Sequence, residues 1–451
     1  MARPKLVYRC SVCSHSLEKW MGKCPQCGQW NTLVEELLVE EKIPFQHPRE
    51  IQPIPYDAIE NIDVSRIKSS IGELDRVLGG GVVDGSLVLV GGDPGVGKST
   101  IMLQMAYNLS LKGMNVLYVS GEESALQLKI RGDRLGVKGS SILIYPEVML
   151  EHVKEQISSM QPDIVIIDSI QSIFSHQIDS SPGSVSQIRY SAGVFMEIAK
   201  TTHTPVFLTG HVTKDGWIAG PKILEHMVDT VLYFEGHTTG ALRVLRAVKN
   251  RFGPTGEIGV FEMKDSGLEE IEDPSGIFVH GNGGDIPGSS VTATIEGSRA
   301  FLVEVQSLVS KTSFSMPKRI SIGIDATKLS VLLAVMEKRS GIFISSSDVV
   351  VNVAGGIKVS EPAVDLATFM AVASSALERP VPKGVVCIGE IGLNGELRPV
   401  TNMETRIKES RRMGFSQIML PKANQDSLPR IKGVNLKGLS ALREALSILE
   451  S

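Results

Sequence analysis

The stretch Gly92-Asp93-Pro94-Gly95-Val96-Gly97-Lys98-Ser99 lies between an apolar run at residues 87–90 and a helix-compatible run at residues 100–111. This strand–loop–helix context is what the pattern GxxxxGKS requires when it acts as a Walker A phosphate loop. The glycines allow backbone N–H groups to close around phosphate oxygens, and the N-terminus of the following helix adds positive partial charge. The stretch therefore predicts an α/β fold that binds a nucleoside triphosphate.

The residues of this loop have separate expected roles. Lys98 is expected to reach the β- and γ-phosphates, and the hydroxyl of Ser99 to ligate Mg²⁺. ATP and Mg²⁺ are the expected substrate and ion. The predicted nucleotide-binding residues are Gly92, Asp93, Pro94, Gly95, Val96, Gly97, Lys98, Ser99 and Thr100.

Helix-like and strand-like segments alternate after the loop and lead to a second acidic motif. Strands are predicted at residues 115–120, 141–145 and 164–168, and helices at 123–135 and 147–160. The last strand, Ile164-Val165-Ile166-Ile167-Asp168, is a Walker B pattern, and Asp168 would hold the Mg²⁺ shell. Such a series predicts a doubly wound parallel sheet with its site at the carboxyl ends of the strands.

An acidic pair follows the strand predicted at residues 115–120. A carboxylate at a neighbouring strand end can orient and polarise an attacking water, and Glu122 is in the position for this role. Glu123 is the competing candidate, although it could instead stabilise the first turn of the next helix.

Four of the five cysteines form two CxxC pairs, Cys10–Cys13 and Cys24–Cys27, with ten residues between the pairs. Two such CxxC pairs supply the four thiolates of a closed tetrahedral Zn²⁺ site. A disulfide or redox pair is the alternative, and the symmetry of the two pairs argues against it. Because four thiolates leave no open position on the metal, the predicted role of the zinc is structural.

Aromatic and basic residues surround these cysteines. Tyr8, Trp20 and Trp30 are interleaved with Arg3, Lys5, Arg9, Lys19 and Lys23, against a single acid, Glu18. This mixture suits contact with a nucleic acid or a protein. Equally, the aromatic side chains could form the small core of the module.

The composition limits the class of protein. The chain has 451 residues, enough for about two or three domains, and a net charge of −4. No global positive field draws it onto nucleic acid, so such contact must come from local patches. No apolar run approaches a membrane span, and residues 1–9 lack the apolar core of a signal peptide. With Cys387 interpreted as a small core residue, these features predict a cytoplasmic protein.

Two further motifs carry a resemblance to a known family. Residues 72–81, Gly72-Glu73-Leu74-Asp75-Arg76-Val77-Leu78-Gly79-Gly80-Gly81, resemble the segment that precedes the phosphate loop of RecA-like ATPases. Lys249-Asn250-Arg251-Phe252-Gly253 resembles the signature pentapeptide of the RadA (Sms) family of bacterial DNA-repair proteins. The four-cysteine module and the long C-terminal region match that family too, so the resemblance covers essentially the whole chain.

The resemblance implies a RecA-like P-loop NTPase core that assembles into a homo-oligomer, a hexameric ring around single-stranded DNA. ATP would lie between subunits, and Lys249 and Arg251 would reach the γ-phosphate of the neighbouring subunit's ATP. A cation delivered in this way makes hydrolysis depend on assembly. The alternative is that Lys249 and Arg251 belong to a solvated basic turn.

Three residues are candidates for coupling ATP to DNA. Thr209-Gly210-His211 comes directly after the strand predicted at residues 205–208, where RecA-like proteins place a polar sensor of the γ-phosphate, and His211 is the first candidate. Lys214 and Trp217 lie in a following loop, 212–221, which together with loop 175–186 would face the channel of a ring. Backbone amides, a lysine and an aromatic side chain suit sequence-neutral binding of a single strand. The alternative is that both are ordinary mobile surface loops.

The C-terminal region resembles the Lon protease domain through the stretch at residues 389–400, GEIGLNGELRPV. The match puts Ala363 at the position of the Lon serine and Glu404 near that of the lysine, so no activated nucleophile is expected. A role in assembly and DNA contact is expected instead. Lys311, Lys318, Arg319 and Lys328 could form a basic surface or a scattered solvated face.

The predicted domains are a zinc module at 1–34, a linker at 35–65, a RecA-like ATPase at 66–270 and a Lon-protease-like domain at 285–451, with a hinge at 265–289. The predicted function is a DNA-dependent ATPase of homologous recombination and repair, acting beside RecA recombinase. It would process branched intermediates by helicase-like branch migration on single-stranded DNA. The alternatives are a RecA-like regulatory or scaffold ATPase without translocation, and an ATP-dependent protease.

Overall fold

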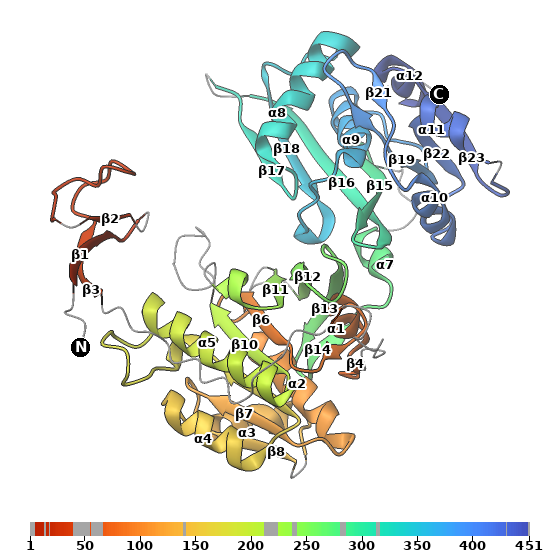
Figure 1. Cartoon of the computed structure of the whole chain (residues 1–451). Helices are drawn as coiled ribbons and strands as arrows, with labels where there is room; N and C mark the ends of the chain where they lie inside the picture. The colour runs from red at the N-terminus through yellow and green to blue at the C-terminus, as the bar shows by residue number, and fades with distance from the viewer. Residues whose placement is uncertain are drawn as a thin grey trace. The chain divides into compact units, whose positions relative to one another are not determined.

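The computed structural model describes residues 5–12, 15–17, 19–38, 55, 66–138, 141–211, 224–236, 241–279, 286–312, 316–429 and 431–449. The chain forms two compact units (Figure 1). The first unit is Met1–Asp63 with Asp215–Ile218, and the second is Val64–Lys214 with Ala219–Ser451.

The first unit is built on a small antiparallel sheet in the order β2-β1-β3, with β1 at Lys5–Cys10, β2 at Ser16–Leu17 and β3 at Leu33–Leu38. Strand β3 therefore continues past residue 34, where the sequence predicted the module to end. Buried Cys10, Cys24 and Leu33 form its core, with Tyr8, Leu17 and Cys27 packed against them. Trp20 and Trp30 are 58% and 68% exposed. Of the three aromatic residues that could have formed this core, Tyr8 alone packs in it.

The second unit contains a sheet in which the structure describes nine strands, in the order β14-β13-β12-β11-β6-β10-β9-β7-β8. The six strands from β11 to β8 run parallel, while β12, β13 and β14 extend the sheet antiparallel. The predicted doubly wound core is present, and the antiparallel extension is an addition to it. The strands are β6 Leu87–Gly92, β7 Val116–Ser120, β8 Ile142–Tyr145, β9 Ile164–Asp168, β10 Val206–His211, β11 Thr230–Glu235, β12 Leu242–Asn250, β13 Ile258–Lys264 and β14 Gly267–Glu270.

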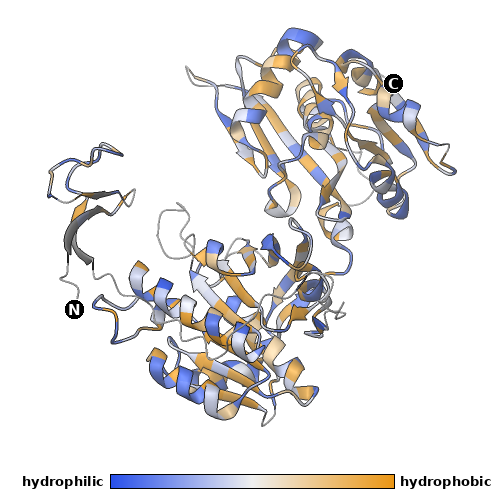
Figure 2. Ribbon diagram, in the orientation of Figure 1, coloured by the Kyte–Doolittle hydropathy of each residue, from blue (hydrophilic) through white to orange (hydrophobic). Residues whose placement is uncertain are grey.

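Helices cover both faces of this sheet (Figure 1). Val88 and Val90 of β6 pack on the side of the first three helices, whereas Leu87 and Leu89 pack on the side of the other two. This alternation is the period-two pattern of a strand buried on both faces, and the strands are largely orange in Figure 2. The helices are α1 Gly72–Val77, α2 Lys98–Leu111 and α3 Ala125–Arg134 on one face, and α4 Leu150–Met160 and α5 Val185–Thr202 on the other.

The register of the parallel strands brings the sequence motifs to one edge. His211 of β10 lies beside Gly92 of β6, and Asp168 of β9 lies beside Ser120 of β7. Because these strands are parallel, their carboxyl ends share an edge, which is where α/β sheets bind ligands.

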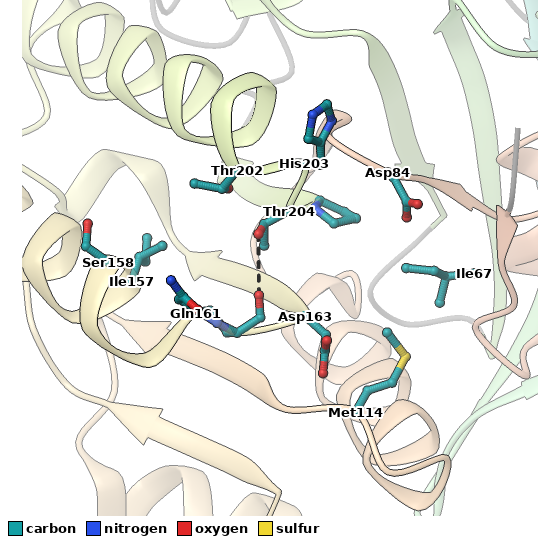
Figure 3. A pocket seen from close by; sticks show the side chains of 12 residues that line it. Ile67, Asp84, Met114, Ile157, Ser158, Gln161, Asp163, Thr202, His203 and Thr204 are labelled. Carbon is teal, nitrogen blue, oxygen red and sulfur yellow. Dashed lines mark hydrogen bonds between the residues drawn. The ribbon is translucent and has the colours of Figure 1, made fainter. Parts of the chain in front are cut away.

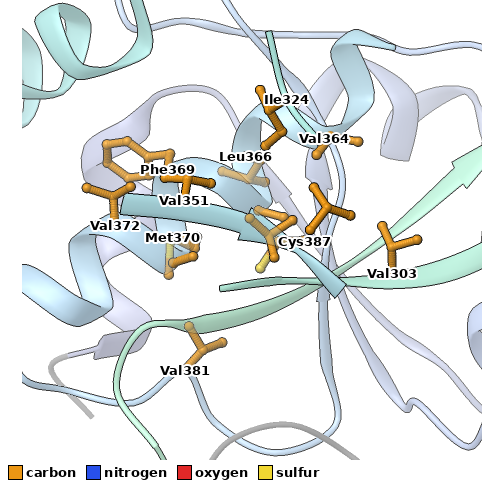
Figure 4. Close-up of a cluster of buried hydrophobic side chains, with 14 of the residues drawn as sticks. Val303, Ile324, Val351, Val364, Leu366, Phe369, Met370, Val372, Val381 and Cys387 are labelled. Atoms are coloured by element: carbon orange, nitrogen blue, oxygen red, sulfur yellow. The ribbon is translucent and has the colours of Figure 1, made fainter. Parts of the chain in front are cut away.

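The C-terminal part of the second unit is a separate sheet in the order β17-β18-β16-β15-β19-β22-β23. Helices α8 and α9 pack on one face with Val303, Val351 and Phe369 (Figure 4), and α10 packs on the other with Val386. The elements are β15 Ser289–Glu296, β16 Arg299–Lys311, β17 Arg319–Ile322, α8 Ala326–Val335, β18 Ser347–Val353, α9 Asp365–Leu377, β19 Val385–Cys387, α10 Met403–Arg412, β22 Gln417–Pro421 and β23 Asn435–Leu439.

Cys387 is fully buried in this domain, as the sequence predicted. Its burial raises the pKa of the thiol to about 12. Helix α8 of this domain stops at Val335, and a π turn follows at Met336–Ser340.

The hinge expected at residues 265–289 is wrong for its described part. It contains β14, which pairs with β13, and a helix, α7, at Pro274–Phe278. Phe278 is fully buried, with its ring centroid 5.8 Å from that of Phe301. The connection between the two sheets is therefore packed.

The turn between β15 and β16 is tied to the ATPase sheet by charged groups. Arg299 lies 3.2 Å from buried Glu73 of α1, and Glu296 is paired with Arg246 of β12. The backbone N–H of Ser298 donates to buried Glu257 at 2.7 Å. These contacts link the C-terminal domain to the antiparallel extension of the ATPase sheet.

A buried ion pair predicts how much the C-terminal domain depends on one side chain. Arg406, 1% exposed, donates to both carboxylate oxygens of Glu361 at 2.6 and 2.7 Å. Arg406→Ala leaves that carboxylate without its ion-pair partner. The free energy of unfolding of the domain, measured in urea, should therefore fall by about 3–5 kcal/mol. Arg398→Ala, at a half-exposed residue paired with Glu396, is the control and should cost about 1 kcal/mol or less. Equal losses for the two variants would contradict this account.

Candidate functional site

The phosphate loop joins β6 to α2 in a conformation that depends on glycine. Gly95 and Gly97 have φ values of 75° and 119°. A Cβ on Gly97 would also come within 2.9 Å of Met263 and 3.2 Å of Leu268, so β13 and β14 back the loop directly. Helix α2 begins at Lys98, and its N-cap residue, Gly97, has no side chain to cap it. Its first N–H groups are therefore unclaimed by a capping side chain, as anion binding at a helix N-terminus requires.

Lys98 is buried within the loop. Its ammonium group donates to the carbonyls of Gly92 and Asp93 at 2.8 and 3.0 Å and lies 3.2 Å from Nδ1 of His211. Burial lowers the pKa of Lys98, and the nearby carboxylates of Asp168 and Glu122 oppose that shift. The ammonium group of Lys98 thus lies among hydrogen-bond acceptors at the carboxyl edge of the sheet, where phosphate oxygens would bind.

Asp168 is oriented by two hydroxyl groups. Tyr118 of β7 donates to Oδ2 at 2.6 Å, and Thr209 of β10 donates to Oδ1 at 2.5 Å. Burial, followed by the charge of Asp168, raises the pKa of Tyr118, which keeps this hydroxyl a donor. Ser99 and Asp168 offer the oxygen ligands that Mg²⁺ prefers. Sequence reasoning missed Tyr118, because a tyrosine inside a strand carries no motif.

The two glutamates after β7 have different surroundings. Glu122 accepts a hydrogen bond from Ser169 and lies 3.3 Å from Nε2 of His211, with its side chain 46% exposed. Glu123 forms an ion pair with Arg131 of α3, and its backbone N–H donates to Ser120. Glu122 is thus linked to Lys98 of the phosphate loop by His211, whereas Glu123 is paired with the helix that follows it.

His211 bridges the two sides of the site. Its Nδ1 lies toward Lys98 and its Nε2 toward Glu122. Since an ammonium group can only donate, a proton on Nε2 would satisfy both contacts. The backbone carbonyl of His211 also accepts from the Gln171 amide at 3.3 Å.

A further residue that sequence reasoning missed holds the loop from the antiparallel strands. Arg243 of β12 is 3% exposed and donates through Nε to the carbonyl of Val96 at 3.0 Å. Burial lowers the pKa of this guanidinium. No local pattern marks Arg243, since its partner is more than a hundred residues away in the chain.

Lys249 and Arg251 lie at the opposite end of the strands from the phosphate loop. Asn250 is level with Thr230 of β11, which is level with Val88 near the start of β6. Asp229 accepts from the N–H of Leu87 at 3.0 Å and lies 3.3 Å from Arg251. From Leu87 to Gly92 the strand spans about 16 Å at about 3.3 Å per residue. These two cations are therefore remote from the phosphate loop of the same chain.

The side chains of these cations differ in exposure. Lys249 donates to the carbonyls of Glu225 and Val228 at 2.7 and 2.8 Å, and burial and the charge of Arg251 lower its pKa. Arg251 has a side chain that is 57% exposed. It is the more open of the two to another molecule.

The pentapeptide loop is held in place by close packing of two glycines. A Cβ on Gly253 would lie 2.9 Å from the Cα of Gly79, and one on Gly79 would lie 3.0 Å from the Cα of Gly253. Arg66 donates to the carbonyl of Phe252 at 2.6 Å. The two motifs that carry the family resemblance, residues 72–81 and 249–253, are thus in direct contact.

A pocket of about 660 Å³ lies elsewhere, at the amino ends of the parallel strands (Figure 3). Met114, Asp163 and Thr204, which line it, precede β7, β9 and β10. The phosphate loop, Asp168 and His211 lie at the opposite, carboxyl edge of the sheet and do not line this pocket.

One of the two predicted DNA loops is described. Gln187 of α5, 1% exposed, accepts from the N–H of Ser175 at 2.9 Å and donates to the carbonyls of Ser175, Ile178 and Ser180. A buried amide therefore fixes the first half of loop 175–186. Lys214 and Trp217 lie outside the described residues.

The cysteine module is suited to bind zinc. The Sγ atoms of Cys10, Cys24 and Cys27 lie within 4.8 Å of one another, with Cys10 and Cys27 3.6 Å apart. Tetrahedral Zn–S bonds of about 2.3 Å place sulfur atoms about 3.8 Å apart. Cys13 lies outside the described residues. With Cys13 as the expected fourth thiolate, the ligand set would have no open position, and zinc would supply a structural cross-link.

The protease-like position holds no catalytic pair. Ala363 is 1% exposed in the core, and Glu404 is exposed in the first turn of α10. Lys328 lies 2.7 Å from Asp365, whose pKa burial raises to about 6. Lys328 is paired with this carboxylate and its side chain is 27% exposed, so a basic surface that includes Lys328 stays a prediction.

None of the helices that the structure describes has the length and apolar character needed to cross a membrane. Residues 8–35 match a family model described as a rubredoxin metal binding domain, residues 53–217 an AAA domain, and residues 306–424 subunit ChlI of Mg-chelatase.

Similarity to whole proteins extends over the full length. The chain is 48% identical to DNA repair protein RadA of Bacillus subtilis over 99% of both chains, and 44% identical to that of Streptococcus pyogenes over 100% of both. A solved structure of the RadB recombinase is 24% identical, covering 46% of this chain and 99% of its own, with a TM-score of 0.37. The family models and the full-length relatives confirm the predicted fold class and the predicted ATP, Mg²⁺ and Zn²⁺.

The thiolate cluster predicts which cysteines retain zinc. Cys24→Ser should release zinc, because it removes a buried ligand of the closed site. Metal content measured by atomic emission should fall toward zero, whereas the matched variant Cys387→Ser, in the other unit, should keep the zinc of the wild type. Full zinc content in Cys24→Ser would overturn the four-thiolate assignment.

Proposed function

The chain belongs to the family of DNA repair protein RadA, and on this premise we propose that it is a cytoplasmic, DNA-dependent ATPase of homologous recombination and DNA repair. One observation carries the proposal. The carboxyl edge of the sheet assembles Lys98, Asp168, Glu122 and His211, while the family's pentapeptide cations lie at the other end of the same strands.

ATP hydrolysis is assigned to residues at the carboxyl edge. Lys98, which now donates to the carbonyls of Gly92 and Asp93, would bind the β- and γ-phosphates. Ser99 and Asp168 would hold Mg²⁺, which would supply neutralising positive charge. Glu122 polarises the attacking water. Its half-exposed carboxylate beside His211 supports this role over Glu123, which is paired with Arg131.

Lys249 and Arg251 complete the site of a neighbouring subunit. A cation that reaches the γ-phosphate from another chain stabilises the charge of the transition state. The separation of about 16 Å along β6 and the exposed Arg251 side chain support delivery in trans. Head-to-tail contacts of this kind generate a closed ring or an open helical filament, depending on the rotation between subunits, and we assign a hexameric ring.

His211 couples this site to DNA. It contacts both Lys98 and Glu122, and the segment that follows it carries Lys214 and Trp217. A change at the γ-phosphate therefore reaches a loop with residues suited to bind a single strand. The motor uses this coupling for helicase-like branch migration on single-stranded and branched DNA beside RecA recombinase.

The two glutamates provide a matched pair of variants. Glu122→Gln should retain ATP binding but lower turnover roughly 100-fold, the scale for removing one group that stabilises a transition state. Glu123→Gln should change turnover only a few-fold, because it weakens the pair with Arg131. Steady-state turnover at saturating ATP distinguishes them, and the reverse order would assign the water to Glu123.

A mixing experiment tests the composite site. Lys98→Ala and Arg251→Ala should each be inactive alone, because each lacks one half of every site. Randomly mixed rings should regain about one quarter of the wild-type turnover, since about one interface in four combines both intact halves. Mixing Lys98→Ala with the double variant Lys98→Ala/Arg251→Ala provides the control without any intact interface.

Failure of the active mixture to exceed that control would refute action in trans. The same assay with and without single-stranded DNA tests the motor. Turnover that DNA does not stimulate would favour a regulatory or scaffold ATPase.

A further inference from the structure

Two of the three tryptophans of the chain are exposed on the zinc module. Trp20 and Trp30 are 58% and 68% exposed, and neighbouring Met21 is 48% exposed. A Cβ on Gly22 would lie 3.9 Å from the Trp20 ring and 3.6 Å from the Trp30 ring. The two rings therefore flank the same point of the backbone and form one aromatic surface, here called the tryptophan face.

The zinc knuckle fixes this face. Lys23 and Trp30 form an antiparallel bridge, and the N–H of Asn31 donates to the carbonyl of Gly22 at 2.9 Å. Inside that bridge the N–H of Cys24 donates to the carbonyl of Gln29 at 2.9 Å. The rings are thus positioned by the turn that presents the thiolates of Cys24 and Cys27.

The core of the module does not account for the tryptophan face. Tyr8, Leu17 and Leu33 pack with the cysteines, and neither tryptophan belongs to that cluster. Each Trp buries about 150–250 Å² when it is covered. Two large aromatic surfaces left open side by side indicate a binding site.

The charges around the face favour an anionic ligand. Residues 19–34 include Lys19 and Lys23, both exposed, and no carboxylate. The Lys23 ammonium lies 5.7 Å from the centroid of the Trp30 ring. We infer that the tryptophan face binds single-stranded DNA, with bases stacked on Trp20 and Trp30 and phosphates contacting Lys19 and Lys23. The unpaired bases of a single strand have flat rings that stack on tryptophan, and its phosphate backbone carries the negative charge that lysine binds.

This site is additional to the loops assigned to the ATPase domain. The choice of DNA as the nucleic acid rests on the proposed function, whereas the stacking surface does not depend on ATP. A sequence-neutral contact of this kind would hold a single strand independently of the nucleotide state.

Tryptophan fluorescence tests the inference directly. In the full-length Trp217→Phe variant, Trp20 and Trp30 are the remaining tryptophans. Titration with a short oligothymidylate, without nucleotide, should quench their emission, and the quenching should weaken as salt is raised. Unchanged emission at oligonucleotide concentrations that saturate binding would overturn the inference.

Affinity variants provide the second readout. Trp20→Ala/Trp30→Ala should bind labelled oligothymidylate at least roughly 30-fold more weakly, the effect of losing two stacked bases at about 1 kcal/mol or more each. Trp20→Phe/Trp30→Phe should restore most of the affinity, and zinc content must match the wild type in both variants. Unchanged affinity in the alanine variant with zinc retained would reject a DNA site and leave a protein partner as the occupant.

The outcome is separable from that of the proposed function. DNA-stimulated turnover is measured on the wild-type chain, because Trp217 belongs to the loop assigned to the motor. Absence of quenching with intact DNA-stimulated turnover would reject the tryptophan face alone. Quenching without any DNA stimulation of turnover would retain the face and reject the motor.

Discussion

The register of the parallel strands is the constraint on which the active site depends. It aligns Gly92 with His211 and Ser120 with Asp168, so residues far apart in sequence meet at one edge. The same strands place Asn250 level with Val88, at the other end. No side-chain movement bridges about 16 Å of strand, so the pentapeptide cannot serve its own phosphate loop. On the proposed function, a second subunit is therefore part of the chemistry.

The elements around the pentapeptide hold it rigidly in position. Gly79 and Gly253 pack backbone to backbone, and the strand that carries Lys249 also carries Arg246, which is paired with Glu296 of the C-terminal domain. That domain has no nucleophile at Ala363. Its protease-like fold instead contributes a hairpin turn, whose residues brace β12 and α1.

Sequence reasoning succeeded where chemistry imposes a local pattern. The phosphate loop, the strand ending at Asp168 and the CxxC pairs are such patterns, and the fold class and cofactors predicted from them are confirmed. It could not find Tyr118 or Arg243, because their partners meet them only across the folded sheet. The exposure of Trp20 and Trp30 was equally undecided, since composition does not reveal which aromatic residues fill a small core.

The most direct test of a shared active site is a structure of the assembled protein with a non-hydrolysable ATP analogue and single-stranded DNA. The measured quantity is the distance from the Arg251 guanidinium and the Lys249 ammonium to the nearest γ-phosphate. The account predicts hydrogen-bond distances to the γ-phosphate held by the neighbouring subunit's Lys98. Both cations in solvent, or turned toward the nucleotide of their own subunit, would contradict it.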